Sequence, residues 1–266
     1  MRPTVPAPRP SMLADLVSSP IHLHPTAPPA ERVLLPGDPG RALRLAEGLL
    51  DTPKMFNHNR GLWGYSGTAC DGKPLTIQST GMGGPSAAIV IAELHDLGAR
   101  TMVRVGTCGA LHRALVLGEL LVVTEALCAD GTSRALGGAE RLAGDPALLE
   151  ALTAAGGAGT ARGSVVSTDL FYDGRDGEEG EWRERGAWAV EMEAATLFAL
   201  AGRRGFAAGA VLIVSDVLGA ERTRIDPDTL AAAELRLGTV ATAALATEAA
   251  PAGSALVPEA DAAPAA

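Results

Sequence analysis

The sequence is poor in cysteine, in aromatic side chains and in positive charge. Its three cysteines, Cys70, Cys108 and Cys128, lack the close pairing of zinc and redox motifs, which favours free thiols in a reducing cytoplasm and no bound metal. Aromatic residues make up 3% of the chain, so small aliphatic side chains must fill the core. A net charge of -9 argues against a broad nucleic-acid or anionic-membrane surface, because both attract basic patches.

Long apolar segments are missing as well. No stretch supplies the roughly 20 apolar residues that a membrane-spanning helix needs. The N-terminal MRPTVPAPRPSML is interrupted by prolines where a signal peptide needs an apolar run, so we expect a soluble, cytoplasmic protein. Residues 1–19 and the Ala/Pro-rich residues 249–266 are predicted to be mobile extensions of one domain at 20–248.

What the chain does contain is a series of short apolar runs separated by helical patterns. These patterns predict strands at 32–35, 75–79, 101–105, 120–124, 164–166 and 210–214, and helices at 41–50, 85–97, 146–155, 193–204 and 228–247. Because the strands are too apolar to have a wet face, we expect a single α/β domain with a mixed, largely parallel central β-sheet flanked by helices. Ligands of such sheets bind at the carboxyl ends of the strands.

Two arginines stand where an anion could bind. The segment LPGDPGR at 35–41 sets a rigid turn after a strand, so that backbone N–H groups and Arg41 could converge on an oxyanion, although such a segment is more often only a turn. Arg104 lies inside an apolar strand, where its burial is costly without an anionic partner. That partner is either a bound anion or a carboxylate of the chain itself.

Carboxylates follow two other apolar runs. Glu191 and Glu193 flank Met192 and point the same way in extended backbone, which suits the hydroxyls of a sugar, although acidic residues also favour a solvated helix start. Ser215 and Asp216 end a buried strand, where a carboxyl group can have a raised pKa and donate a proton. Asp216 could equally be a turn or N-cap residue.

The order and spacing of these motifs are more specific than any one motif. The segments concerned are Pro20-Ile21-His22, LPGDPGRA at 35–42, NRGLWGYSG at 59–67, TGMGGPSAAI at 80–89, VRVGTCGA at 103–110, STDLFYD at 167–173, VEMEAATLFAL at 190–200 and VSD at 214–216. On these segments the chain resembles the hexameric bacterial purine nucleoside phosphorylases, whose family also contains the uridine phosphorylases. The resemblance covers about 20–248.

The resemblance implies a role for each matching position. The residues that would bind phosphate are Gly37, Arg41, Arg60, Arg104 and Thr107. The residues that would bind ribose are His22, Met192 and Glu193, and those that would frame the base are Cys108, Gly109, Phe171, Val190, Glu191 and Ser215. Asp216 would be the general acid. The stretch at 217–224 is shorter than is usual in the family, and Arg222 and Arg224 both compete for the role of the arginine that assists the acid.

The implied reaction is the reversible phosphorolysis of purine ribonucleosides and deoxyribonucleosides, a step of purine salvage, with inorganic phosphate as co-substrate and no cofactor. The implied assembly is a homohexamer, a trimer of dimers, in which His22 and Arg60 cross the dimer interface. Uridine phosphorylase is the nearest alternative, but no glutamine–arginine pair stands near 171–175 or after Val214. A hydrolytic nucleosidase would dispense with the phosphate-binding arginines. A catalytically silent purine-nucleoside sensor is the alternative from another class.

Overall fold

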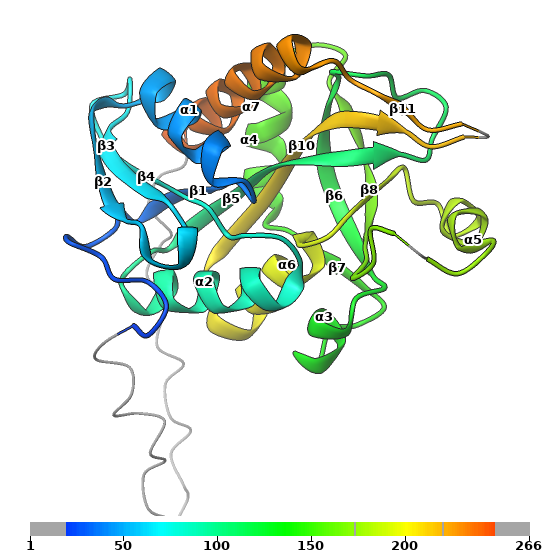
Figure 1. Ribbon diagram of the computed structural model, residues 1–266, viewed down its shortest axis with the longest axis horizontal. Helices are drawn as coiled ribbons and strands as arrows, with labels where there is room; N and C mark the ends of the chain where they lie inside the picture. Colours follow the sequence, from blue (N-terminus) through cyan, green and yellow to red (C-terminus); the bar gives the residue numbers. More distant parts are fainter. Residues whose placement is uncertain (1–19, 173, 220, 248–266) are drawn as a thin grey trace, which may run out of the picture.

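Seven α-helices and eleven strands make up the described part of the chain. The computed structural model describes residues 20–172, 174–219 and 221–247, so the extensions predicted at 1–19 and 249–266 lie outside it (Figure 1). The strands are β1 (Arg32–Leu35), β2 (Asp51–Asn57), β3 (Gly64–Thr68), β4 (Pro74–Gln78), β5 (Thr101–Ala110), β6 (Leu120–Cys128), β7 (Arg141–Ala143), β8 (Ala161–Ser167), β9 (Ala189–Glu191), β10 (Ala207–Val217) and β11 (Thr223–Arg224). The helices are α1 (Pro39–Leu49), α2 (Gly84–Asp96), α3 (Gly131–Ala135), α4 (Pro146–Gly156), α5 (Glu178–Glu184), α6 (Ala194–Arg204) and α7 (Pro227–Thr247), with a 3₁₀ turn, η2, at Asn59–Gly61.

All eleven strands belong to one mixed sheet, in the order β11-β10-β6-β8-β9-β5-β1-β4-β3-β2, with β7 beside β6. Parallel pairings join β4, β1, β5 and β10 into the centre of the sheet, and a second parallel set joins β6, β8 and β9. Antiparallel pairings connect these sets through β6 and β10 and build the β2–β3–β4 edge. The predicted single α/β domain with a mixed, helix-flanked sheet is therefore confirmed.

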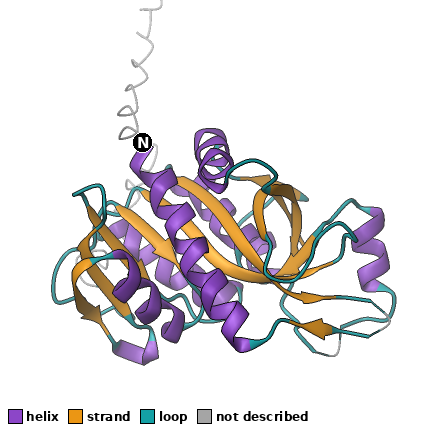
Figure 2. Ribbon diagram, turned by 90° about the horizontal axis from the view of Figure 1, so that it is seen from above, coloured by secondary structure: helices purple, strands orange, loops and turns teal. Residues whose placement is uncertain are grey.

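Helices cover both faces of the sheet. α1, α4 and α7 pack together on one face, and α2 and α6 pack on the other, as Figures 1 and 2 show. Alternate residues of the central strands point to opposite faces of the sheet. Met102 of β5 packs with α2 and α6, whereas Val103 and Val105 pack with α1, α4 and α7. Because both faces are covered, these strands are largely apolar, and the polar residues within β5 and β10 are the exceptions. Among the described residues, no helix is long and apolar enough to span a membrane.

Three of the helices, α1, α4 and α7, begin at an Asp-Pro pair, at Asp38-Pro39, Asp145-Pro146 and Asp226-Pro227. The carboxylates of Asp38 and Asp145 cap α1 and α4 by accepting backbone N–H groups of the first turn, and a proline follows each cap. The turn that follows β1 is therefore also the start of α1, which brings Arg41 to the carboxyl end of the parallel strands.

The two central strands are longer than predicted. β5 continues from Val105 to Ala110, and β10 extends to Val217, because the two strands pair along almost their whole length. A register shift between Val214 and Asp216 marks a bulge near the carboxyl end of β10. The polar ends of both strands therefore belong to the sheet itself and hold their side chains more rigidly than loops would.

Candidate active site

A cavity of about 990 Å³ lies beside the carboxyl ends of β1, β5 and β10 and against β9. Every residue predicted to belong to the site contributes to its wall, except His22 and Arg60. The predicted residues that line it are Gly37, Arg41, Arg104, Thr107, Cys108, Gly109, Phe171, Val190, Glu191, Met192, Glu193, Ser215, Asp216, Arg222 and Arg224. Residues from five separate segments of the sequence thus share one cavity.

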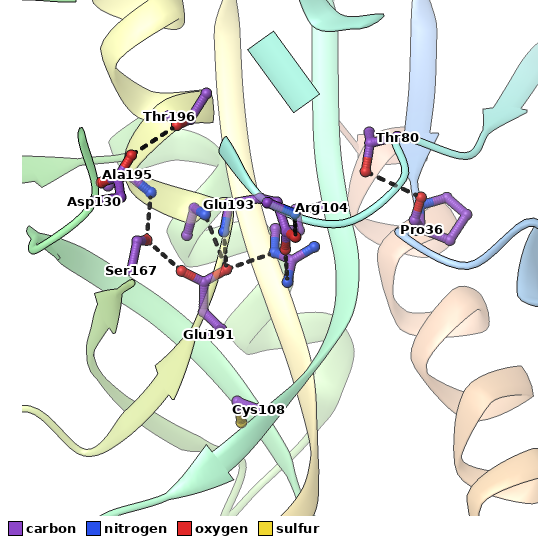
Figure 3. A network of polar contacts seen from close by, with 12 residues as sticks. Pro36, Thr80, Arg104, Cys108, Asp130, Ser167, Glu191, Glu193, Ala195 and Thr196 are labelled. Carbon is purple, nitrogen blue, oxygen red and sulfur yellow. Dashed lines mark hydrogen bonds and ion pairs between the residues drawn. The ribbon is translucent and has the colours of Figure 1, made fainter. Parts of the chain in front are cut away.

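The turn after β1 is fixed by its own cap. Asp38 accepts the backbone N–H groups of Gly40 and Arg41, each at 3.0 Å, so the segment is a capped turn, which is the commoner of the two interpretations. The turn is also tied to the next loop, where the Pro36 carbonyl accepts the Thr80 N–H at 2.9 Å and the Thr80 hydroxyl at 3.4 Å; Figure 3 shows the hydroxyl contact. A Cβ atom on Gly37 would lie 3.1 Å from the Gly81 carbonyl, so glycine permits this close approach.

Arg104 is held by two carboxylates of the β9–α6 segment. Its Nε donates to Glu191 Oε2 at 2.8 Å, and its Nη2 lies 2.6 Å from Glu193 Oε2 (Figure 3). Glu193 also accepts the Gly83 N–H at 2.5 Å. Gly106 gives the guanidinium its space, because a Cβ atom there would lie 2.8 Å from the Arg104 Cζ. The internal partner considered for Arg104 is therefore present, and the arginine lines the cavity as well.

Glu191 fixes the start of α6 as well as Arg104. Its Oε2 accepts the backbone N–H groups of Glu193 and Ala194 at 2.8 and 2.9 Å, and its Oε1 accepts the Ser167 hydroxyl. Ser167 in turn accepts the Ala195 N–H at 2.9 Å. Both carboxylates are buried rather than solvated, so the reading of this segment as a solvated helix start is wrong.

Burial and charge set the protonation of this cluster. Burial tends to lower the pKa of Arg104, but Glu193 and Glu191 outweigh it and raise that pKa, so the guanidinium stays charged. Burial raises the pKa of Glu193 although Arg104 opposes the shift, so this carboxyl takes up a proton more readily than a free glutamate does. Burial also raises the pKa of the neighbouring Cys108 thiol, which is therefore a neutral part of the wall.

Asp216 faces the cavity from inside β10. Its Oδ2 accepts the Ser215 hydroxyl at 2.7 Å, while its Oδ1 lies 2.9 Å from Arg222 Nε and 3.1 Å from Arg224 Nε. Arg224 stands opposite Asp216 in the antiparallel β10–β11 pairing. Asp216 is thus neither a turn nor an N-cap residue, and both arginines predicted to compete for it reach it.

Aromatic and small apolar groups form the wall next to Asp216. Phe171 is 47% exposed, and the Arg222 guanidinium carbon lies 4.4 Å from its ring centroid, so this pair brings the loop before α5 to the segment after β10. A Cβ atom on Gly109 would lie 3.2 to 3.3 Å from Leu218 and Val190. Glycine at position 109 therefore permits close packing of this part of the wall.

His22 contacts the η2 turn that carries Arg60, and neither residue lines this cavity. His22 Nδ1 is 2.7 Å from Glu93 Oε1, and the Asn59 side chain donates to the His22 carbonyl at 2.8 Å. Arg60 is exposed and has a left-handed backbone, with φ 57° and ψ 20°. This conformation is uncommon outside glycine and costs of order 1 kcal/mol or more, which is typical of functional positions.

Several residues that shape the site escaped the sequence analysis. They are Asp38, Glu93, Gly106, Ser167 and Glu234, and each acts by holding a predicted residue or segment. Asp38 could have been found, because an Asp-Pro pair before a helical pattern is a cap signal. Gly106 and Ser167 lie within segments that carry the family resemblance but were given no role of their own. Glu93 and Glu234 carry no local signal, since a glutamate on a helix is usually a solvated side chain.

Comparison with known proteins places these observations in a family. The family model described as "Phosphorylase superfamily" matches residues 31–246. A guanosine phosphorylase from Halorubrum lacusprofundi is 41% identical over 192 residues, which is 69% of this chain and 77% of that protein. DeoD-type purine nucleoside phosphorylases from Jannaschia sp. and Alkaliphilus metalliredigens are 41% and 37% identical over 197 and 195 residues, in each case 71% of this chain and 83% of the relative.

Proposed function

The chain belongs to the phosphorylase superfamily, and we propose that it catalyses the reversible phosphorolysis of purine ribonucleosides and deoxyribonucleosides. The products are the free purine base and ribose or deoxyribose 1-phosphate, so the enzyme is a pentosyltransferase of purine salvage. The observation that carries the proposal is that one cavity, at the carboxyl ends of β1, β5 and β10, is lined by three kinds of group. These are the arginines Arg41 and Arg104, the carboxylates Glu191 and Glu193, and the buried Asp216. Inorganic phosphate is a co-substrate, and no cofactor enters the mechanism.

The phosphate end of the cavity is formed by Gly37, Arg41, Arg104 and Thr107. The bound phosphate offsets the oxocarbenium character that develops on the ribose as the glycosidic bond breaks. One of its oxygen atoms forms the new bond to the anomeric carbon. The bonding electrons of the broken C–N bond stay on the purine.

Asp216 donates the proton that allows a neutral base to leave. The proton goes from the Asp216 carboxyl to the purine N7. Arg222 and Arg224 both contact Oδ1, which leaves Oδ2, beside the Ser215 hydroxyl, as the oxygen that carries the proton. Both arginines stabilise the carboxylate that the transfer leaves behind.

The ribose and the base occupy the space between these two ends. Met192 and Glu193 hold the ribose, with His22 of a neighbouring subunit. The base is framed by Cys108, Gly109, Phe171, Val190, Glu191 and Ser215. Of these, Glu191 is already engaged by Arg104, Ser167 and two backbone amides, so its part is to shape the site rather than to hydrogen-bond the ring.

The active enzyme is a homohexamer built as a trimer of dimers, located in the cytoplasm, in which His22 and Arg60 complete the site of a neighbouring subunit. Two observations support this arrangement. Neither residue lines the cavity of its own chain, and a hydrogen bond from Asn59 to the His22 carbonyl connects the two segments that carry them. Arg60→Met should raise the KM for phosphate while the oligomer measured by sedimentation stays intact. A monomeric protein with full activity would refute the shared site.

The test of the function is release of free base from adenosine, inosine, guanosine and uridine, with and without phosphate, followed by liquid chromatography. Phosphate-dependent release from the purine nucleosides, with the sugar 1-phosphate as co-product, is the expected result. Cleavage of uridine alone would indicate a uridine phosphorylase, and cleavage without phosphate a nucleosidase. Binding of inosine without turnover would indicate a sensor.

A further inference from the structure

Glu234 of α7 is a buried carboxylate that the reaction described above does not use. Its side chain is 2% exposed, although it lies on a helix at the surface of the protein. Oε1 accepts Arg41 Nε at 2.8 Å, and Oε2 accepts Arg44 Nε at 2.7 Å. One carboxylate therefore bridges two guanidinium groups of α1, of which Arg41 lines the cavity and Arg44 does not.

Close packing of α1 against α7 makes this bridge possible. A Cβ atom on Gly238 would lie 2.5 Å from a Leu45 methyl carbon, and one on Gly48 would lie 2.5 Å from a Leu235 methyl carbon. Glycines thus let the two helices approach where Glu234 meets α1. Gly238 is four residues after Glu234 and shares its face of the helix.

The bridge fixes Arg41 while leaving its outer nitrogens available. Within the described residues, the side-chain contacts of Arg41 with protein acceptors run through Nε to Glu234. Its backbone N–H is held separately by Asp38. The guanidinium is therefore anchored at its inner edge, and its terminal nitrogens are left for an anion in the cavity.

We propose that Glu234 is a positioning residue for phosphate, which acts by holding the Arg41 guanidinium in the orientation that binds it. This inference rests on the proposed function, in which Arg41 is a phosphate ligand. A carboxylate so close to a phosphate site would by itself repel the anion. Arg44, whose side chain is 49% exposed, cancels that charge without lining the cavity. Glu234 can therefore orient the Arg41 guanidinium, while Arg44 offsets the repulsion between the Glu234 carboxylate and a bound phosphate.

The test is Glu234→Gln in the full-length enzyme, with steady-state kinetics in which phosphate and inosine are varied separately. If Glu234 positions Arg41, the KM for phosphate rises about tenfold or more, equivalent to about 1.4 kcal/mol, while the KM for inosine changes less than about twofold. If Glu234 is merely a nearby negative charge, its removal lowers the KM for phosphate, which overturns the inference. The shift in unfolding temperature that added inorganic phosphate produces should shrink in parallel.

Two further variants separate geometry from charge. The double variant Arg44→Met, Glu234→Gln keeps the net charge that Arg41, Arg44 and Glu234 have together in the wild type. If Glu234 acts by positioning Arg41, this variant should still bind phosphate weakly. A wild-type KM for phosphate in it would refute the positioning role. It also serves where the single variant folds poorly, because it removes the lone extra cation. Glu47→Gln makes the same chemical change on the exposed side of α1 and should leave phosphate kinetics unchanged. A wild-type enzyme without phosphate-dependent turnover would instead overturn the proposed function.

Discussion

Replacing Arg104 by glutamine should separate the contribution of the buried ion-pair cluster to stability from its contribution to phosphate binding. The side chains of Arg104, Glu191 and Glu193 are 7%, 0% and 8% exposed, so the variant leaves two buried carboxylates without their cation. Breaking a buried ion pair in this way costs about 3–5 kcal/mol. At about 2–4 °C per kcal/mol for a domain of this size, the unfolding temperature should fall by about 6–20 °C.

The pH dependence of this loss has a definite sign. Burial already raises the pKa of Glu193, and removal of the opposing guanidinium should raise it further. A carboxyl group whose pKa is higher in the folded state than in the unfolded state favours folding below its unfolded pKa, and this contribution is lost as the pH rises. The difference in stability between wild type and variant should therefore be largest above neutral pH and smaller near pH 5.

The assay is thermal unfolding at one fixed protein concentration, with phosphorolysis measured on the same samples. The double variant Arg104→Gln, Glu193→Gln carries one buried carboxylate fewer, so it should regain much of the lost stability and none of the phosphate-dependent activity. An Arg104→Gln protein that unfolds at the wild-type temperature would refute the described cluster. Recovery of activity in the double variant would refute the role of Arg104 in binding phosphate.

The remaining predictions concern the acid, its arginines and the N-terminal segment. Asp216→Asn should slow phosphorolysis by about 10²–10⁴-fold with little change in the KM for phosphate, and a loss below tenfold would exclude it as the acid. Arg224→Met should lower kcat. Arg222→Met should lower kcat and also raise the KM for the nucleoside, because Arg222 contacts the Phe171 ring. Identical effects of the two substitutions would contradict this distinction. Burial works to raise the pKa of Glu93, but hydrogen bonds from His22 and three backbone amides lower it. Glu93→Gln should therefore destabilise the protein at neutral pH, and the difference should shrink as the pH falls below the ordinary glutamate pKa and be lost below the lowered pKa of Glu93.

The sequence predicted those elements whose signal is local. The range of β1 is as predicted, and the helices at α1, α4 and α6 begin or end within two residues of the expected positions. β5 and β10 were predicted too short because the apolar run ends before the pairing does. β2, β3 and α5 were missed because their polar, mixed sequences show neither alternation nor an apolar stripe.

The site was predictable where a residue type is out of place. A charged residue within or at the end of an apolar strand is expected to be buried, and burial of a charge is costly unless it has a partner or a function. Arg104 and Asp216 were singled out for that reason. Glu234 and Ser167 could not be found in this way, because each becomes significant only through a partner 193 or 24 residues away. Tertiary packing, rather than any local pattern, brings these supporting groups to the site.

The charge of the proposed phosphate-binding end of the cavity bears on the proposed role of Arg60. Arg104 contacts Glu191 and Glu193, Arg41 and Arg44 share Glu234, and Arg44 also lies 3.5 Å from Asp38, so three arginines meet four carboxylates. Such a site offers hydrogen-bond donors to phosphate but no excess positive charge. In the proposed assembly, Arg60, which is exposed in a turn with positive φ and does not line the cavity of its own chain, would supply a further cation to the site of a second copy. A raised pKa for Glu193 works in the same direction, because each proton that it takes up leaves Arg104 with more charge for the anion.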